Sequence, residues 1–163
     1  MKKVVPSTST TSLRPDRRIS DRARLLYVED DDENWQVAEL RLADEFELIR
    51  AANSREACRI VKESCADLMG ILMDIELRGS ELNGIELTEL FRGKRPNKPL
   101  PDYAMGLPTF TQPIIFVTAH GARYSDVELM LFGADRVIPK PVNFSALALA
   151  LQSIQLSSPV RKR

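Results

Sequence analysis

Cysteine is scarce in this chain, with two residues among 163. Cys58 and Cys65 have neither the spacing of a metal site nor the context of a disulfide framework, so we expect reduced thiols and a cytoplasmic location. Long hydrophobic runs are missing as well. The N-terminus has no apolar signal core, and prolines or polar residues interrupt the two uncharged stretches, 103–122 and 141–160. We therefore expect neither secretion nor a membrane span.

The chain also lacks a surplus of either charge, because 23 basic residues balance 23 acidic ones. The distribution is uneven, since residues 1–24 carry a net charge of +5, residues 161–163 carry +3, and the body between them carries −8. An acidic body argues against nucleic-acid binding through the folded domain, although basic ends could contact phosphates weakly. The hydrophobic fraction of 44% is ordinary for a domain that buries a core.

Composition divides the chain into three parts. Residues 1–22 contain a Ser/Thr run at 7–12 and few apolar residues, which predicts a flexible basic tail. Residues 23–157 form the predicted folded domain, and residues 158–163 a basic C-terminal tail. The domain holds a Pro-rich insertion at about 93–112. We expect it at the amino edge of the sheet, where it could not act as a lid over a site.

Short apolar runs alternate with helical segments through the domain. We predict strands at 25–28, 46–50, 68–73, 113–117 and 136–138, and helices at 31–44, 54–63, 85–92, 124–132 and 145–154. Asp31 or Asp32 would cap the first helix, and Asn53 or Ser54 the second. This alternation predicts an α/β fold with a five-stranded parallel sheet and helices on both faces.

The last predicted helix has an unusual polarity. Phe144, Leu147, Leu151 and Ile154 form a stripe that should face the core, while Leu149 and its neighbours leave the other side with little charge. That side is interpreted either as a partner surface or as one buried against the insertion.

Chemistry-bearing residues follow the ends of four predicted strands. Glu29 and Asp30 follow the first strand, Asp74 follows the third, and Thr118 and Lys140 end the fourth and fifth. Carboxyl ends of parallel strands meet at one edge of the sheet. Three carboxylates gathered there would repel one another without a cation, and Mg²⁺ suits such a set of oxygen ligands. Lys140 and Thr118 suit a phosphoryl group, which points to phosphoryl transfer onto a carboxylate.

Four separated motifs carry a resemblance to a known family. They are Val28-Glu29-Asp30-Asp31, Ile71-Leu72-Met73-Asp74, Val117-Thr118-Ala119 and Lys140-Pro141. In this order and at these separations they resemble the receiver domain of two-component response regulators, over residues 24 to 155. The resemblance implies a doubly wound, flavodoxin-like sheet with strand order 2-1-3-4-5.

The resemblance also implies a role for each site residue. Asp74 would be the phosphoacceptor, and Glu29 and Asp30 would form the acidic pocket. Asp30, Asp74 and the backbone carbonyl of Glu76 would ligate Mg²⁺. Thr118 would be the switch hydroxyl, and Lys140 would contact the phosphoryl oxygens and precede a cis bond to Pro141.

Three departures from the family pattern stand out. The loop at 75–84 is about two residues longer than usual, and Arg78 stands where the family commonly has proline. Val137 occupies the position of the usual switch aromatic, so an aromatic rotamer flip cannot report the state of Thr118. Glu76 and His120 occupy variable positions that tune the lifetime of the acyl phosphate in the family, although His120 also suits an exposed loop.

We therefore expect a single-domain response regulator that catalyses only its own phosphorylation and dephosphorylation. Its partners would be a histidine kinase or phosphotransfer protein, a downstream protein, and a second copy of the chain. The downstream protein would bind a surface formed by the fourth helix, fifth strand and last helix, with Met130, Leu131 and Leu149 as apolar contacts. The alternatives are a phosphorylation-independent pseudo-receiver adaptor, suggested by Val137 and the altered loop, and a Mg²⁺-dependent phosphohydrolase with Glu76 as general acid.

Overall fold

The computed structural model describes residues 22–119 and 123–157. Its strands are β1 (Ala23–Val28), β2 (Phe46–Ala51), β3 (Leu68–Met73), β4 (Ile114–Thr118) and β5 (Arg136–Pro139). The α-helices are α1 (Asp32–Leu42), α2 (Ser54–Ser64), α3 (Gly84–Phe91), α4 (Asp126–Leu131) and α5 (Phe144–Ser157). All strand pairs are parallel, in the order β2-β1-β3-β4-β5, as predicted.

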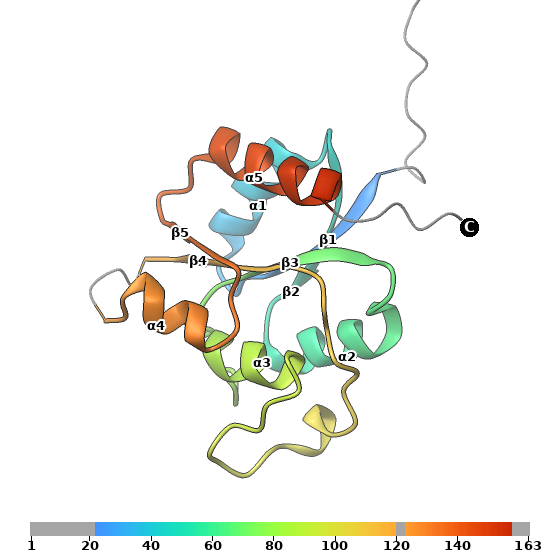
Figure 1. Ribbon diagram of the computed structural model, residues 1–163, viewed down its shortest axis with the longest axis vertical. Helices are drawn as coiled ribbons and strands as arrows, with labels where there is room; N and C mark the ends of the chain where they lie inside the picture. The colour runs from blue at the N-terminus through green and yellow to red at the C-terminus, as the bar shows by residue number, and fades with distance from the viewer. Residues whose placement is uncertain (1–21, 120–122, 158–163) are drawn as a thin grey trace, which may run out of the picture.

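Two helical layers cover the sheet (Figure 1). One face carries α1 and α5 over a core that includes Leu25, Leu72 and Leu147. The other carries α2, α3 and α4 over a larger core that includes Phe91 and Phe116. Leu149 is exposed on α5, and the insertion packs on the opposite layer, so the interpretation of Leu149 as buried against the insertion is wrong.

The helices begin where side chains satisfy their free N–H groups. Of the alternatives left open by the sequence, Asp31 caps α1 by accepting from the Asn34 N–H, and Asn53 caps α2 by accepting from the Glu56 N–H. Capping boxes formed by Asn83 with Glu86, and by Ser125 with Glu128, open α3 and α4. These caps fix the loops at the carboxyl edge of the sheet.

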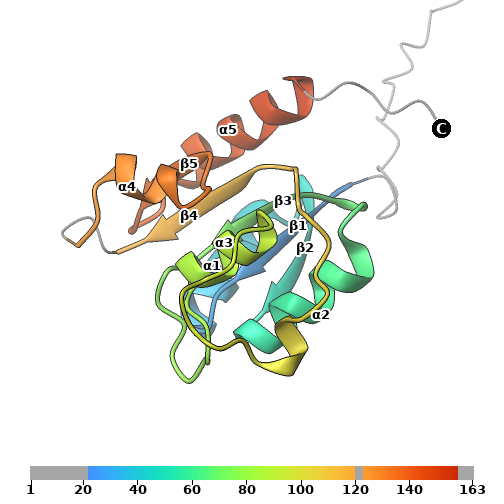
Figure 2. The same cartoon turned by 60° about the horizontal axis from the view of Figure 1, so that its bottom comes forward.

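The segment between α3 and β4 does not stay at the amino edge of the sheet, so this expectation is corrected. It runs back along the α2–α3 layer (Figure 2), and its 3-10 turn η2 (Asp102–Ala104) packs beside α2. The Tyr103 hydroxyl lies 2.7 Å from the Ser54 hydroxyl at the start of α2. The Lys98 ammonium donates to the Glu81 carbonyl in the β3–α3 loop, at 2.8 Å. Burial of Ala104 and Phe110 favours this return path.

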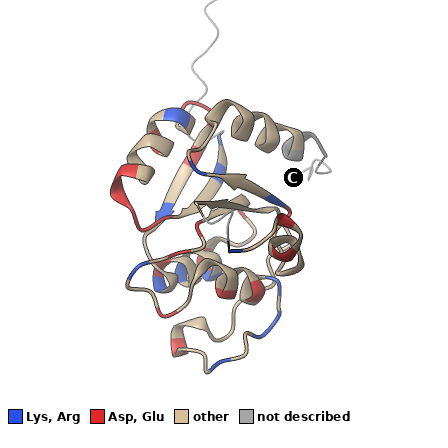
Figure 3. Cartoon of the chain, turned by 90° about the vertical axis from the view of Figure 1, so that its left-hand side faces the viewer, with Lys and Arg blue, Asp and Glu red and all other residues tan. Residues whose placement is uncertain are grey.

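Within the described residues, no helix is both long enough and apolar enough to cross a membrane. Cys58 and Cys65 are free thiols, and burial raises the pKa of Cys58 to about 11. Positions of Lys and Arg are interspersed with positions of Asp and Glu along the ribbon drawn in Figure 3. Of the predicted N-terminal tail only Arg22 is described, and its guanidinium donates to the Ala43 carbonyl. The other residues of that tail and the predicted C-terminal tail lie outside the described residues.

Candidate phosphoacceptor site

The register of the central strands brings acidic residues together. Val28 of β1 pairs with Met73 of β3, so the residues that follow, Glu29 and Asp74, leave the sheet side by side. The Asp74 N–H donates to the Val28 carbonyl at 3.0 Å, which continues the ladder by one step. The chain crosses from β2 to β3 past β1, so this edge is the topological switch point of the sheet, where α/β folds bind ligands.

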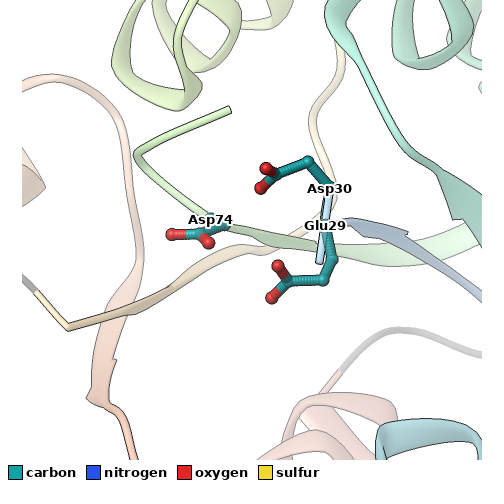
Figure 4. Close-up of side chains that lie close together, drawn as sticks. All are labelled: Glu29, Asp30 and Asp74. Atoms are coloured by element: carbon teal, nitrogen blue, oxygen red, sulfur yellow. The ribbon is translucent and has the colours of Figure 1, made fainter. Parts of the chain in front are cut away.

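Three carboxylates converge at this point (Figure 4). Glu29, Asp30 and Asp74 each place one carboxylate oxygen within 4.8 Å of the others. Glu29 is fully buried and Asp74 is 8% exposed. Three negative charges this close are costly without a cation. The donor set of carboxylate oxygens fits a hard divalent cation better than a soft one.

Lys140 reaches this cluster from the end of β5. Thr118 pairs with Pro139 in the sheet, and the Lys140 N–H donates to the Thr118 carbonyl at 2.9 Å. The Lys140 ammonium donates to Glu29 Oε2 at 2.8 Å and to Asp74 Oδ2 at 2.7 Å. The peptide bond between Lys140 and Pro141 is cis, as predicted. One ammonium thus neutralises part of the charge on two buried acids.

Burial and ion pairing both affect the pKa values of Asp74 and Lys140. Burial raises the pKa of Asp74 above its ordinary value, and this outweighs the lowering by Lys140; the charge of Glu29 adds to the increase. Burial opposes the charged form of Lys140, but its hydrogen bonds to Asp74 and Glu29 dominate and raise its pKa. The ammonium is therefore retained throughout the neutral range.

Two further groups, not predicted from the sequence, fix Glu29. The Tyr27 hydroxyl donates to Glu29 Oε2 at 3.0 Å, and the Asp31 N–H donates to Glu29 Oε1 at 3.1 Å. Burial, followed by the charge of Glu29, raises the pKa of Tyr27. Tyr27 lies two residues before Glu29, which places both on one side of the extended chain. That spacing was an available signal for this contact.

Asp30 is bound by Arg78, a contact that was not predicted from the sequence either. The Arg78 N–H and Nε donate to Asp30 Oδ2 at 3.3 and 3.1 Å, and Nη2 donates to Asp31 Oδ2 at 3.1 Å. The hydrogen bond to Asp30 is the main cause that raises the pKa of Arg78. The residue that departs from the family pattern therefore contacts one of the three clustered acids.

The predicted switch and tuning residues lie around the cluster. Thr118 is buried at the end of β4. Val137 is half-buried in β5 and packs against the same core as Tyr124 and Phe132, which form an edge-to-face pair with centroids 6.3 Å apart. The Glu76 carboxylate lies 3.7 Å from Arg123 Nη1. His120 is outside the described residues.

A pocket of about 320 Å³ is lined in part by the residues that directly follow Asp74. Its lining comes from the β3–α3 and β4–α4 loops: Ile75, Glu76, Leu77, Arg78, Asn83, Arg123 and Tyr124. The insertion contributes none of these residues. The pocket lies between these two loops.

Comparisons with known proteins agree with this geometry. The model of the response regulator receiver domain family matches residues 25–152. An NtrX-like response regulator of Rickettsia felis is 28% identical over 129 residues, which cover 78% of this chain and 24% of that protein. The chain therefore spans about a quarter of the length of the curated relatives it matches.

Solved structures share the fold. The signal receiver domain of a LuxO repressor protein from Vibrio parahaemolyticus aligns with a TM-score of 0.67 and 21% identity, over 87% of this chain and 99% of that one. The receiver domain of the sensor histidine kinase PA1611 from Pseudomonas aeruginosa, with magnesium coordinated in its active site cleft, aligns with a TM-score of 0.64 and 23% identity, over 83% and 99%. With the family model matching most of its length, the chain belongs to the response regulator receiver domain family.

Proposed function

We propose that residues 23–157 act in the cytoplasm as a phosphorylation-dependent signalling switch. Asp74 accepts a phosphoryl group from a histidine kinase or a phosphotransfer protein, and the protein signals by altered binding to another protein. The observation that carries this proposal is the meeting of Glu29, Asp30 and Asp74 at one edge of the sheet, with Lys140 hydrogen-bonded to two of them.

Each residue has a chemical task in this proposal. The Asp74 carboxylate attacks phosphorus, the bond from phosphorus to the donor atom breaks, and an acyl phosphate forms on Asp74. Lys140 pairs with the added phosphoryl oxygens, and the Thr118 hydroxyl donates to one of them. Glu29, Asp30, Asp74 and the Glu76 carbonyl would hold Mg²⁺, and the bound ion would supply positive charge to the phosphoryl group. Glu76 and His120 tune the access of water to the acyl phosphate.

The output surface in this proposal is formed by α4, β5 and α5. Met130, Leu131 and Leu149 are large apolar residues exposed there. Such residues suit a protein partner, either a downstream target or a second copy of the chain. Phosphorylation shifts a two-state equilibrium that changes the affinity of this surface. Because Val137 replaces the usual aromatic, that shift proceeds without a rotamer flip at position 137.

Phosphoryl uptake can be tested directly by intact-mass measurement. Wild-type protein incubated with acetyl phosphate or a cognate kinase and Mg²⁺ should gain one phosphoryl group. Asp74→Ala or removal of Mg²⁺ should prevent this gain. Phos-tag electrophoresis provides a second readout, and binding of beryllofluoride with Mg²⁺ a third. Equal labelling of wild type and Asp74→Ala would refute the proposal.

The pseudo-receiver remains the second candidate, and two observations favour it. Val137 replaces the switch aromatic, and Arg78 is bound to a proposed metal ligand. Full cellular function of Asp74→Asn would support this candidate over the phosphorylated switch. Repeated release of phosphate from a generic phosphomonoester, instead of single labelling, would favour a phosphohydrolase.

A further inference from the structure

Arg78 binds one of the clustered acids through both its backbone and its side chain. Its N–H and Nε converge on the same oxygen, Asp30 Oδ2, at 3.3 and 3.1 Å. The Asp30 side chain is only 12% exposed, whereas the Arg78 side chain is 77% exposed. The guanidinium therefore approaches a largely covered carboxylate from the solvent side.

Two described cations contact the carboxylates of the three acids, whereas Arg50 donates only to the backbone carbonyls of Glu29 and Asp30, at 3.2 and 3.1 Å. Lys140 contacts Glu29 and Asp74, and Arg78 contacts Asp30. A divalent cation that used Asp30 as a ligand would lie about 2.1 Å from a carboxylate oxygen. The Arg78 guanidinium would then be a positive charge within a few ångströms of the ion, where repulsion is strong. Arg78 and the metal ion therefore compete for Asp30.

Arg78 also has a second anchor outside the metal cluster. Its Nη2 donates to Asp31 Oδ2 at 3.1 Å, and Asp31 is the N-cap of α1. The ion pair with Asp31 can hold the side chain when Asp30 is released. Exposed ion pairs of arginine are weak and easily rearranged, so the guanidinium is displaceable.

We infer that Arg78 is an internal competitor of the divalent cation: it occupies Asp30 in the metal-free protein and lowers the affinity of the site for Mg²⁺. This inference rests on the proposed function, because it concerns the same metal site. Arg78, in the lengthened β3–α3 loop, would then have a role in regulation. The receiver would be phosphorylated only when enough Mg²⁺ is present to displace the Arg78 guanidinium from Asp30.

Calorimetric titration of the full chain with MgCl₂ at constant ionic strength tests the inference. The dissociation constant for Mg²⁺ should fall by about 3- to 10-fold in Arg78→Ala. Arg78→Gln should behave in the same way, and it provides a second variant if the alanine form folds poorly. Fluorescence of Trp35 gives an independent readout, because its ring lies 6.4 Å from that of Tyr27, whose hydroxyl binds Glu29.

Arg123→Ala is the matched control. It removes the same charge from the lining of the same pocket, but Arg123 pairs with Glu76 rather than with Asp30. Its Mg²⁺ affinity should change by less than about 2-fold. An equal gain in both variants would mean that general electrostatics, not competition for Asp30, sets the affinity, and it would overturn the inference.

The dependence of the phosphorylation rate on Mg²⁺ concentration distinguishes the competition by Arg78 from the proposed function of Asp74 as phosphoacceptor. At limiting Mg²⁺, Arg78→Ala should be labelled by acetyl phosphate faster than wild type, and the two rates should converge at saturating Mg²⁺. Unchanged or weakened Mg²⁺ binding in Arg78→Ala, with normal labelling, refutes the inference alone. Absence of Mg²⁺ binding and of labelling in every form refutes the proposed function as well.

Discussion

Lys140 and Arg78 bring positive charge to the same acidic cluster from different parts of the fold. Lys140 extends from β5, is 16% exposed and bridges two buried acids. Arg78 lies in the β3–α3 loop, is 77% exposed and bridges Asp30 and Asp31. A buried bridge is expensive to break because it leaves charges without partners, whereas an exposed bridge rearranges at little cost. The β5 side is therefore a fixed part of the site, and the loop side is adjustable.

Replacement of Lys140 should produce the largest effect. Lys140→Met leaves Glu29 and Asp74 without their shared cation and should lower the free energy of unfolding by about 3 kcal/mol. Phosphorylation by acetyl phosphate should slow on the order of 100-fold or more. Urea unfolding and intact-mass time courses measure the two effects. Because the pKa of Lys140 is raised in the folded protein, the ion pairs of Lys140 stabilise the fold fully below pH 10.5. This contribution to the free energy of unfolding is lost as the pH rises through the raised pKa of the folded protein.

Lys98→Met is the control for this substitution, because Lys98 pairs with Glu86 at the surface. It should cost less than about 1 kcal/mol. The double variant with Asp74→Asn should recover part of the stability lost in Lys140→Met, since one of the two stranded charges is gone. A Lys140→Met protein as stable as wild type would contradict the description of the β5 side as fixed.

Two glycines allow the tip of the β3–α3 loop, at Gly79, to be compared with its end at Gly84, the first residue of α3. A Cβ on Gly84 would lie 2.0 Å from the carbonyl oxygen of Asp74, so Gly84→Ala must displace the backbone of the phosphoacceptor. We expect a loss of about 3 kcal/mol in unfolding free energy. Gly79 has open space around it and a φ of +71°, so Gly79→Ala should cost about 1 kcal/mol from backbone strain alone. Equal losses of unfolding free energy in Gly84→Ala and Gly79→Ala, measured by urea unfolding, would contradict this difference between the two positions.

A smaller effect is expected where the insertion meets α2. Tyr103→Phe and Ser54→Ala each remove one side of the 2.7 Å hydrogen bond between the two hydroxyls. Each should cost about 1 kcal/mol, and the double variant should cost less than their sum. Hydrogen exchange of residues 80–83 should quicken in Tyr103→Phe, because the Ser80 hydroxyl accepts from the Ser54 N–H. Additive losses in unfolding free energy, with unchanged hydrogen-exchange rates at residues 80–83, would indicate that the insertion does not stabilise the β3–α3 loop.

The arrangement of strands was accessible from sequence because each strand is a short apolar run between polar turns. The β3 bounds, Leu68–Met73, agree with prediction, and the convergence of Glu29 with Asp74 follows from parallel register. The contact between Arg78 and Asp30 was not accessible, since it joins a long loop to a residue 48 positions away without periodicity. The insertion was misplaced for a similar reason. Prolines predict an irregular path, but its direction depends on tertiary contacts such as the burial of Phe110 and the pairing of Tyr103 with Ser54.

The return path of the insertion links the two edges of the sheet. The segment leaves α3 at the amino edge, meets Glu81 and Ser54 near the carboxyl edge, and returns to begin β4, the strand that ends in Thr118. The loop that follows Asp74 is therefore joined to β4 by the Lys98–Glu81 contact and the continuous length of backbone after Lys98. In the proposed switch, the insertion would serve as a tether between the loop that follows Asp74 and the strand that ends in Thr118.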